Sequence, residues 1–310
     1  MNVLFILLGL LLLVKGGDYL VDGAVAIARH LGLSGMVIGL TVIGFGTSMP
    51  ELLVSVQAAW VGNSGIAIGN VVGSNISNIA LILGASALIC PLPTSRSTMM
   101  IEMPFMILAS ILFVGIAWTG SIERVPGLLL FAMLVAFVSW QVRRSHRLQK
   151  DSGRDEAAPS MSLWRALLVV IVAFAALVWG ADMLVDGASD IARQLGVSDR
   201  LIGLTIVAVG TSLPELFASV MAARKGQTDM AVGNIIGSVS FNILSVVGLS
   251  AAICPIRDSN EGFLIDYLVM IFLCLLLWFF MGTQRKLVRW EGGVLLSLYV
   301  VYLIFTVTGA

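Results

Sequence analysis

The sequence predicts an all-α integral membrane protein in which ten transmembrane helices form two inverted-topology repeats of five. Three observations support this fold class: the composition, the number of apolar runs and an internal duplication. The 310 residues are 58% hydrophobic and only 12% charged, and the mean hydropathy is +1.01. Soluble domains have far more charged residues than this. Most of the chain is therefore expected to lie inside a lipid bilayer.

Ten apolar runs are long enough to cross that bilayer. A transmembrane helix needs about 20 mainly apolar residues to span a hydrocarbon core roughly 30 Å thick. The run at the start of the chain is expected to be a helix, because it lacks the basic leading segment and the cleavage site of a secretory signal. The ten runs cover residues 2–28, 36–60, 66–91, 97–118, 124–142, 163–192, 199–223, 228–253, 262–281 and 290–308.

A polar linker at residues 143–162 divides the chain into two halves, residues 1–142 and 163–310. The linker is too short to hold a folded domain. If it is cytoplasmic, thirteen of the 18 Lys and Arg residues lie at cytoplasmic loops and four at the opposite face, with Lys15 inside the first run. The positive-inside rule then predicts a multi-pass protein of the plasma membrane with both termini outside the cell.

The two halves superpose after a shift of 164 residues. Between residues 37–55 and 201–219, 11 of 19 positions are identical. Each half has an odd number of expected helices, so the second half must enter the membrane in the opposite orientation. Inverted repeats of this kind are an architecture of secondary transporters, whose binding sites lie near the bilayer midplane where the repeats meet.

The first duplicated motif places a glutamate and a proline in the middle of an apolar run. It reads "GFGTSMPELLVS" at residues 44–55 and "AVGTSLPELFAS" at residues 208–219. An ionised carboxylate at this depth is costly unless it is paired, solvated or bound to a cation. Glu51 and Glu215 are therefore candidate cation ligands. We also expect the helices to unwind around residues 44–48 and 208–212, which would free carbonyl oxygens for the same cation.

A structural alternative is that this motif only restarts a helix. "SMPE" and "SLPE" match the Ser-x-x-Glu capping box, with a proline early in the helix. Thr47 or Ser48, and Thr211 or Ser212, would then be the caps. We favour the cation site, because an uncharged residue could serve the helix without burying a charge.

The second duplicated motif supplies small residues and neutral oxygens. It reads "GNVVGSNISN" at residues 69–78 and "GNIIGSVSFN" at residues 233–242. Its glycines favour close helix packing, whereas its Ser and Asn side chains form i, i+4 pairs on one helix face. These pairs are Ser74 with Asn78 and Ser238 with Asn242. Together with the carboxylates they form an all-oxygen ligand set, which suits Ca²⁺ and disfavours zinc or copper.

Two aspartate pairs also recur, Asp18 with Asp22 and Asp182 with Asp186, each near one end of a long helix. They are expected either to be solvated or capping residues, or to form a vestibule that attracts cations. The formal net charge of zero argues against nucleic-acid binding. No HExxH, GxSxG or P-loop pattern occurs, so the sequence does not indicate an enzyme, a cofactor or an obligate protein partner.

These paired motifs resemble the two alpha repeats of the sodium/calcium exchanger family, in the cation/calcium exchanger superfamily, over nearly the whole chain. The resemblance is to a short, prokaryotic-type member, because the linker has no room for the calcium-sensing domains of animal members. It implies export of Ca²⁺ against inward Na⁺ by alternating access, with these two ions as substrates and the lipid bilayer as surroundings. The first and sixth helices would be the gating helices.

The resemblance also implies roles for individual residues. Asn242 stands where the potassium-dependent branch has an acid, which favours a potassium-independent exchanger. Val239 stands where the first repeat has Asn75, so Asn75 is not expected to have a symmetric role. The implied ligands are the carboxylates of Glu51 and Glu215, main-chain oxygens at Thr47, Thr211, Gly44 and Ala208, hydroxyls of Ser48, Ser74, Ser212 and Ser238, and amides of Asn78 and Asn242.

Three other functions stay open from the sequence. In a proton/calcium exchanger of the same fold, Glu51 or Glu215 would take up protons in place of Na⁺. A passive cation channel would also tolerate polar residues at the midplane, although broken helices in an inverted repeat suit alternating access better. A membrane enzyme or structural protein would not need the two glutamates for ion transport.

Overall fold

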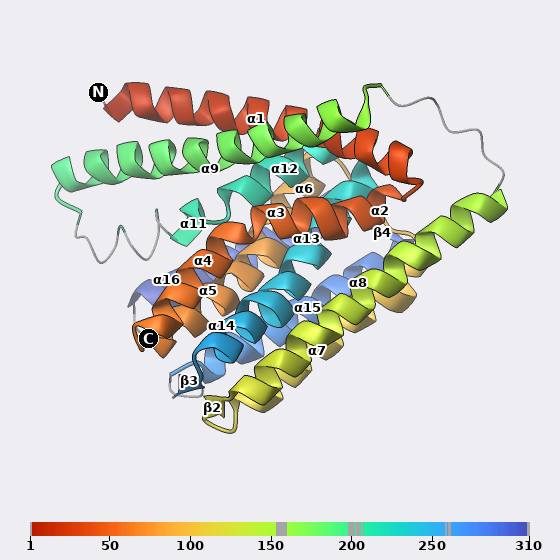
Figure 1. Ribbon diagram of the computed structural model, residues 1–310. Helices are drawn as coiled ribbons and strands as arrows, with labels where there is room; N and C mark the ends of the chain where they lie inside the picture. The colour runs from red at the N-terminus through yellow and green to blue at the C-terminus, as the bar shows by residue number, and fades with distance from the viewer. Residues whose placement is uncertain are drawn as a thin grey trace.

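The computed structural model is helical almost throughout (Figure 1) and describes residues 2–152, 160–197, 202, 206, 208–257, 259 and 262–308. The first half contains α1 (Asn2–Leu31), α2 (Gly35–Ile38), the π-helical segment η1 (Gly39–Ile43), α3 (Gly44–Thr47), α4 (Met49–Trp60), α5 (Ser64–Ile76), the π-helical segment η2 (Ser77–Leu83), α6 (Gly84–Ile89), strand β1 (Leu92–Pro93), the π-helical segment η3 (Thr98–Glu102), α7 (Met103–Ala117), strand β2 (Ser121–Ile122) and α8 (Arg124–Ser152). The second half contains α9 (Leu163–Gln194), α11 (Ala208–Gly210), α12 (Leu213–Arg224), α13 (Thr228–Phe241), the π-helical segment η5 (Asn242–Val247), α14 (Gly248–Ile253), strand β3 (Ile256–Arg257), α15 (Leu264–Gln284), strand β4 (Lys286–Leu287) and α16 (Arg289–Thr308).

The helices that could cross a membrane agree with the expected apolar runs. Within the described residues, eight helices are long and apolar enough to do so, and the bent pair Gly35–Thr47 and Met49–Trp60 makes a ninth. The run expected over residues 199–223 lies partly outside the described residues, so the number ten stays a prediction. The chain is a multi-pass membrane protein.

The polar linker starts as a helix. We expected the fifth apolar helix to end at residue 142, but α8 continues to Ser152. The reason is that the first part of the linker, "RRSHRLQKDS", contains several residues of good helix propensity and no glycine or proline. A helix that leaves the apolar region therefore has no signal to stop there.

The long helices α1 and α9 pack as an antiparallel pair. Figure 1 shows them side by side across one face of the bundle that the other helices form. Glycines allow this contact, because a Cβ on Gly9 would lie 2.7 Å from the carbonyl oxygen of Gly180. A Cβ on Gly180 would in turn lie 2.9 Å from the carbonyl oxygen of Gly9. The first helix of each half thus meets its counterpart through backbone contacts.

Other elements of the two halves also meet in a matched way. Strand β1 pairs antiparallel with β4, and β2 with β3, so each short sheet contains one strand from each half. Ser110 and Cys274, which are 164 residues apart, lie 3.8 Å from each other between α7 and α15. Each strand pair also joins two loops that the distribution of Lys and Arg assigned to the same face of the membrane.

The bent span of the first half packs against α13 of the second half. A Cβ on Gly39 would lie 2.4 Å from the carbonyl oxygen of Met230, and one on Gly237 would lie 2.5 Å from that of Leu40. The packing role expected for the glycines of the second motif is therefore confirmed in the second half. Gly73 is the counterpart of Gly237 in the first half, and no described atom lies within 4 Å of a Cβ built on Gly73.

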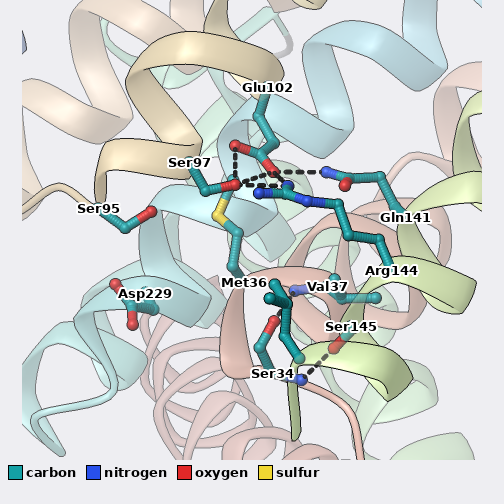
Figure 2. A pocket seen from close by; sticks show the side chains of 11 residues that line it. Ser34, Met36, Val37, Ser95, Ser97, Glu102, Gln141, Arg144, Ser145 and Asp229 are labelled. Carbon is teal, nitrogen blue, oxygen red and sulfur yellow. Dashed lines mark hydrogen bonds and ion pairs between the residues drawn. The ribbon is translucent and has the colours of Figure 1, made fainter. Parts of the chain in front are cut away.

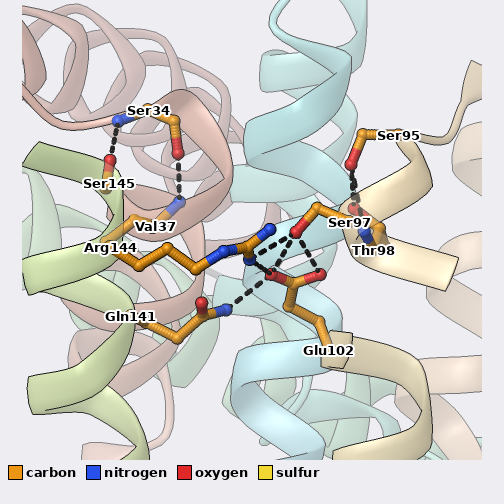
Figure 3. A network of polar contacts seen from close by, with 9 residues as sticks. All are labelled: Ser34, Val37, Ser95, Ser97, Thr98, Glu102, Gln141, Arg144 and Ser145. Carbon is orange, nitrogen blue, oxygen red and sulfur yellow. Dashed lines mark hydrogen bonds and ion pairs between the residues drawn. The ribbon is translucent and has the colours of Figure 1, made fainter. Parts of the chain in front are cut away.

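A buried polar network joins α8 to the segment that precedes α7. Glu102 is 2% exposed, and its Oε1 accepts hydrogen bonds from Gln141 Nε2 at 2.6 Å and Ser97 Oγ at 2.9 Å (Figure 3). Arg144 lies 3.5 Å from the same oxygen, and Ser97 also bonds Oε2 at 3.2 Å. These side chains line a cavity of about 240 Å³ (Figure 2). The charge of Glu102 is thus compensated by its neighbours.

The packing at Gly39 predicts a stability effect. Gly39→Ala should destabilise the protein by roughly 1–3 kcal/mol, because the added methyl group would overlap the backbone of α13. Thermal unfolding in detergent measures this effect. Gly115→Ala in α7 is the matched control, since no described atom lies within 4 Å of its Cβ and alanine favours helices. A melting temperature that falls equally in both variants would contradict the packing argument.

Candidate cation-binding site

Two glutamates from opposite halves lie buried at the centre of the molecule. Glu51 is 1% exposed and Glu215 is fully buried, and each lies in the first helical turn after a break, in α4 and α12. The two carboxylates are close enough to interact electrostatically. None of their four oxygens accepts a hydrogen bond of good geometry from a described residue. Two charges are therefore buried together, and among the described residues neither has a positively charged partner or a hydrogen-bond donor in good geometry.

The break between α3 and α4 is shorter than the sequence predicts, because only Ser48 separates the two helices. The helices on either side of Ser48 are inclined by 47°, but α3 is helical over Gly44–Thr47. The expected unwinding from residue 44 is therefore wrong, and the Gly44 carbonyl accepts the N–H of Ser48 at 3.1 Å. Pro50 explains the difference, because a proline without an N–H is tolerated in the first turn of α4 and interrupts only the bonding just before it.

The equivalent break in the second half is arranged differently. The unwinding expected from residue 208 is wrong for Ala208–Gly210, which is helical, but Thr211 and Ser212 are both non-helical. The N–H of Ser212 donates to the carbonyl of Val209 at 3.1 Å. The carbonyl of Ala208 therefore does not receive the bond that the Gly44 carbonyl receives in the first half. The side chain of Ala208 lies outside the described residues.

The two serines do not cap the helices that follow them. Ser48 and Ser212 occupy the positions before α4 and α12, as a capping box would require, but neither side chain makes a capping hydrogen bond. Both hydroxyl oxygens are buried and make no hydrogen bond of good geometry to a described residue, although Ser48 lies near the carboxylate of Glu215. A helix-restart role alone therefore does not account for the motif.

More unpartnered polar atoms come from the second motif. The second-motif elements pack against the glutamate-bearing helices of both halves: α4 and α12 contact η5 and η2, respectively. Ser74 differs from the others, because its hydroxyl donates to the carbonyl of Asn70 at 2.6 Å. The buried atoms without a partner among the described residues include Ser238 Oγ, Asn242 Oδ1, and both Nδ2 and Oδ1 of Asn78.

Contacts between the halves place Gly44, Thr47 and Ser48 of the first motif next to residues of the second half. Thr47 and Ser48 lie near the carboxylate of Glu215, and Thr47 Oγ1 is 3.4 Å from Asn234 Oδ1. A Cβ on Gly44 would lie 3.1 Å from the backbone nitrogen of Ser238. The first motif of one half is thus set against the second motif of the other.

Two asparagines that the sequence reading left without a role hold the glutamate helices in place. Asn70 Nδ2 donates to the carbonyl of Glu51 at 3.1 Å and to Ser55 Oγ at 2.9 Å. Asn234 Nδ2 makes the equivalent bonds in the second half, to the carbonyl of Glu215 at 3.4 Å and to Ser219 Oγ at 2.8 Å. A signal was present, because Asn70 and Ser55 both recur after the 164-residue shift.

The two aspartate pairs have different surroundings. Asp182 and Asp186 line a cavity of about 330 Å³ that also contacts Pro50, Pro214 and Thr211, next to the buried glutamates. Asp18 and Asp22 instead bind Lys225, whose Nζ lies 2.8 Å and 2.6 Å from their Oδ1 atoms. Burial lowers the pKa of Lys225, but its hydrogen bonds to Asp18 and Asp22 and their charges outweigh burial and raise the pKa above its ordinary value.

The chemistry of the central site suits a cation with hard ligands. Two carboxylates without partners provide a formal charge of −2, and hydroxyl and amide oxygens surround them. Such all-oxygen sites bind Ca²⁺, which takes about six to eight oxygens. A bound cation would also compensate the two charges that the protein leaves unpaired.

Comparisons with known proteins agree with this chemistry. The family described as "Sodium/calcium exchanger protein" matches residues 1–143 and 165–308. The chain is 39% identical over 307 residues to "Putative antiporter CaxA" of Alkalimonas amylolytica, covering 96% of both chains. It is 35% identical over 341 residues to "Sodium/calcium exchanger MaX1" of Methanosarcina acetivorans, covering 98% of this chain and 97% of that one. Among solved structures, the sodium-calcium exchanger NCX_Mj superposes with a TM-score of 0.83 at 33% identity, covering 98% of both chains.

The buried charges predict how stability responds to Ca²⁺. Glu51→Gln or Glu215→Gln should raise the melting temperature of the ion-free protein, because each change removes an uncompensated charge. The same variants should lose most of the increase that Ca²⁺ gives the unchanged protein, because a ligand stabilises only the state that binds it. Thermal unfolding with and without Ca²⁺ measures both effects.

Glu102→Gln is the control for this measurement. Its carboxylate is as buried as those of the site but has protein partners, so the variant should be destabilised and should keep the full response to Ca²⁺. An unchanged Ca²⁺ response in both site variants would exclude Glu51 and Glu215 as ligands.

Proposed function

The chain belongs to the sodium/calcium exchanger family, and from this we propose that it is a secondary antiporter that exchanges Na⁺ for Ca²⁺ across the plasma membrane. Members of this family are cation antiporters, and the relatives named above include sodium/calcium exchangers. The observation that carries the proposal is the pair of buried glutamates, one from each half, whose carboxylates accept no hydrogen bond of good geometry within the described part of the chain. Two such charges need cations to neutralise them.

The ions are held by side chains of both halves. Glu51 and Glu215 provide the charge, with hydroxyl oxygens from Ser48, Ser212 and Ser238. The unpartnered side-chain atoms at these positions support this assignment. The other ligands are Ser74, Asn78, Asn242 and main-chain oxygens of Thr47, Thr211, Gly44 and Ala208.

The two halves are inverted repeats, the first over residues 1–142 and the second over residues 163–310, with ten membrane spans in all. The antiparallel α1–α9 pair and the two sheets that each combine both halves support this arrangement. An even number of spans places both termini on one face, and the excess of Lys and Arg around residues 143–162 makes that face extracellular.

Exchange follows from charge balance at one site. With both glutamates ionised the site carries about −2, so one Ca²⁺ or two Na⁺ neutralise it, and a third Na⁺ would leave a surplus. An empty site would keep two unpaired buried charges, which makes a conformational change without ions unfavourable. Competition between Na⁺ and Ca²⁺ for the same carboxylates therefore couples their movements.

Na⁺ is favoured over H⁺ as the coupling ion because neutral hydroxyls surround the carboxylates. A proton would need only the carboxylate itself, whereas Na⁺ uses additional oxygen ligands. The neutral amide of Asn242, at 0% exposure, adds no third charge for a K⁺ ion. The same site is therefore proposed to work without K⁺.

Access alternates between the two faces by movement of α1 and α9 over the site. The cavity that Asp182 and Asp186 line next to Pro50 and Pro214 supports an entry vestibule on one face. Beside α1, Lys225 directly after α12 forms ion pairs with Asp18 and Asp22. These contacts support a closed path to the site on that face. Unequal closure is what an alternating-access carrier shows in any one state.

Transport assays test the proposed exchange. Proteoliposomes loaded with Na⁺ should take up radioactive Ca²⁺, and Glu51→Gln or Glu215→Gln should reduce uptake to the level of protein-free vesicles. Glu291→Gln, a buried glutamate that bonds the N–H of Val288 and Thr283 Oγ1, should still exchange. Uptake driven by a pH gradient alone would instead identify a proton/calcium exchanger, and flux without any counter-ion would identify a channel.

The ion pairs of Lys225 with Asp18 and Asp22 predict that their loss increases local opening of α1. Lys225→Gln should raise the amide hydrogen exchange of residues 18–31 roughly twofold to fivefold, the size expected for partly exposed ion pairs. The effect should be present at neutral pH and disappear only as the pH rises above the raised pKa of Lys225. Arg224→Gln, which removes an exposed neighbouring charge, is the control. Equal exchange in the two variants would argue against a closing role.

A further inference from the structure

At one pair of equivalent positions in the second motif, a polar side chain of the first half is replaced by an apolar one in the second half: Asn75 in α5 and Val239 in α13. Asn75 is fully buried, and its Oδ1 accepts a hydrogen bond from Asn242 Nδ2 at 3.1 Å. This contact joins the two halves across the predicted site. In the second half, Val239 has no polar side chain with which to make the equivalent bond to Asn78.

The contacts of Asn242 determine which way its amide points. Its Nδ2 also donates to Ser74 Oγ at 3.1 Å. The Ser74 hydroxyl gives its own proton to the carbonyl of Asn70 at 2.6 Å, so its oxygen can only accept from Asn242. The Asn75 amide presents its Oδ1 to Asn242, because its own Nδ2 donates to Met270 Sδ at 3.7 Å. Both neighbours of the Asn242 amide are therefore acceptors, and both require its NH₂ group. Asn242 Oδ1 must point the other way.

The oxygen of Asn242 that is turned away has no hydrogen-bond partner among the residues that the structure describes. Asn242 Oδ1 is buried and unsatisfied, as are the carboxylate oxygens of Glu51 and Glu215. The η5 segment that begins at Asn242 contacts α4, which carries Glu51. An amide oxygen in this position is a suitable ligand for a hard cation, whereas an amide NH₂ group would repel one.

We propose that Asn75 is a positioning residue that locks the amide of Asn242 with Oδ1 toward the bound cation. This inference rests on the proposed function, because it assigns the orientation of a ligand in that ion site. It makes the site asymmetric. Asn242 is a fixed oxygen ligand, whereas both side-chain atoms of Asn78 lack a partner, so Asn78 can turn either atom toward an ion.

The test replaces Asn75 by the residue that the second half has at the equivalent position. Asn75→Val removes one of two acceptors for Asn242 Nδ2, so the amide loses much of its preference for one orientation. The KM for Ca²⁺ should rise roughly fivefold to tenfold, the effect expected from one buried hydrogen bond. The maximal rate should change less. Equilibrium Ca²⁺ binding by calorimetry should weaken by the same factor.

A second background separates positioning from a merely structural role. In Asn242→Asp, an oxygen faces the cation whichever way the carboxylate turns, so the orientation of the group no longer matters. Adding Asn75→Val to this background should change the KM less than twofold, whereas a structural role predicts the same loss in both backgrounds. Ser110→Ala, a buried hydroxyl change in α7, should leave the KM unchanged.

The outcomes distinguish this inference from the proposed function. Absence of Na⁺-dependent Ca²⁺ uptake by the unchanged protein would refute the function. Normal uptake with an unchanged KM in Asn75→Val, or an equal loss in both backgrounds, would refute the positioning role alone. Thermal unfolding without ions checks that each variant is folded. If Asn75→Val does not fold, Asn75→Leu, which matches the shape of asparagine, takes its place under the same criteria.

Discussion

Two uncompensated carboxylates inside a membrane protein are the constraint on which the rest of this structure depends. Other buried glutamates of the chain are satisfied by their neighbours: Glu102 by Gln141, Ser97 and Arg144, and Glu291 by Thr283 and the N–H of Val288. The carboxylates of Glu51 and Glu215 accept no hydrogen bond of good geometry from the described residues. In the proposed function a bound ion offsets their cost, so that the ion-free site is a high-energy state and the loaded site a stable one. That difference is what lets a gradient of one ion move another.

The surroundings keep this costly pair in place. The helices α4 and α12, which start at Met49 and Leu213, carry each glutamate in their first turn. Asn70 and Asn234 donate hydrogen bonds to the main-chain carbonyls of these glutamates. Glycines in the bent span and in α13 allow the backbones of the two halves to lie in direct contact. A loosely packed site would admit water or protein donors to the carboxylates, which would weaken their need for a cation.

Most of the fold could be predicted because membrane helices are specified by local composition. Nine of the expected apolar runs correspond to described spans, and the duplicated motifs pointed to the elements that meet at the centre. The expected unwinding from Gly44 was wrong, since a proline interrupts only the bonds next to it and the helix continues to Thr47. The predicted end of the fifth helix at residue 142 was also wrong, because α8 continues to Ser152. A change to polar residues marks the end of the apolar region but not the end of a helix.

The sequence by itself determined the membrane spans, the duplication, the family and the residue types of the site, since each depends on composition or on spacing along the chain. Tertiary structure alone decided which polar atoms are left without partners. Ser74 and Ser238 are equivalent in sequence, yet only Ser74 donates to a carbonyl and accepts from Asn242. Lys225 binds one aspartate pair, while the equivalent pair lines a cavity. Such differences arise from contacts between segments far apart in the chain, which a repeat in sequence cannot show.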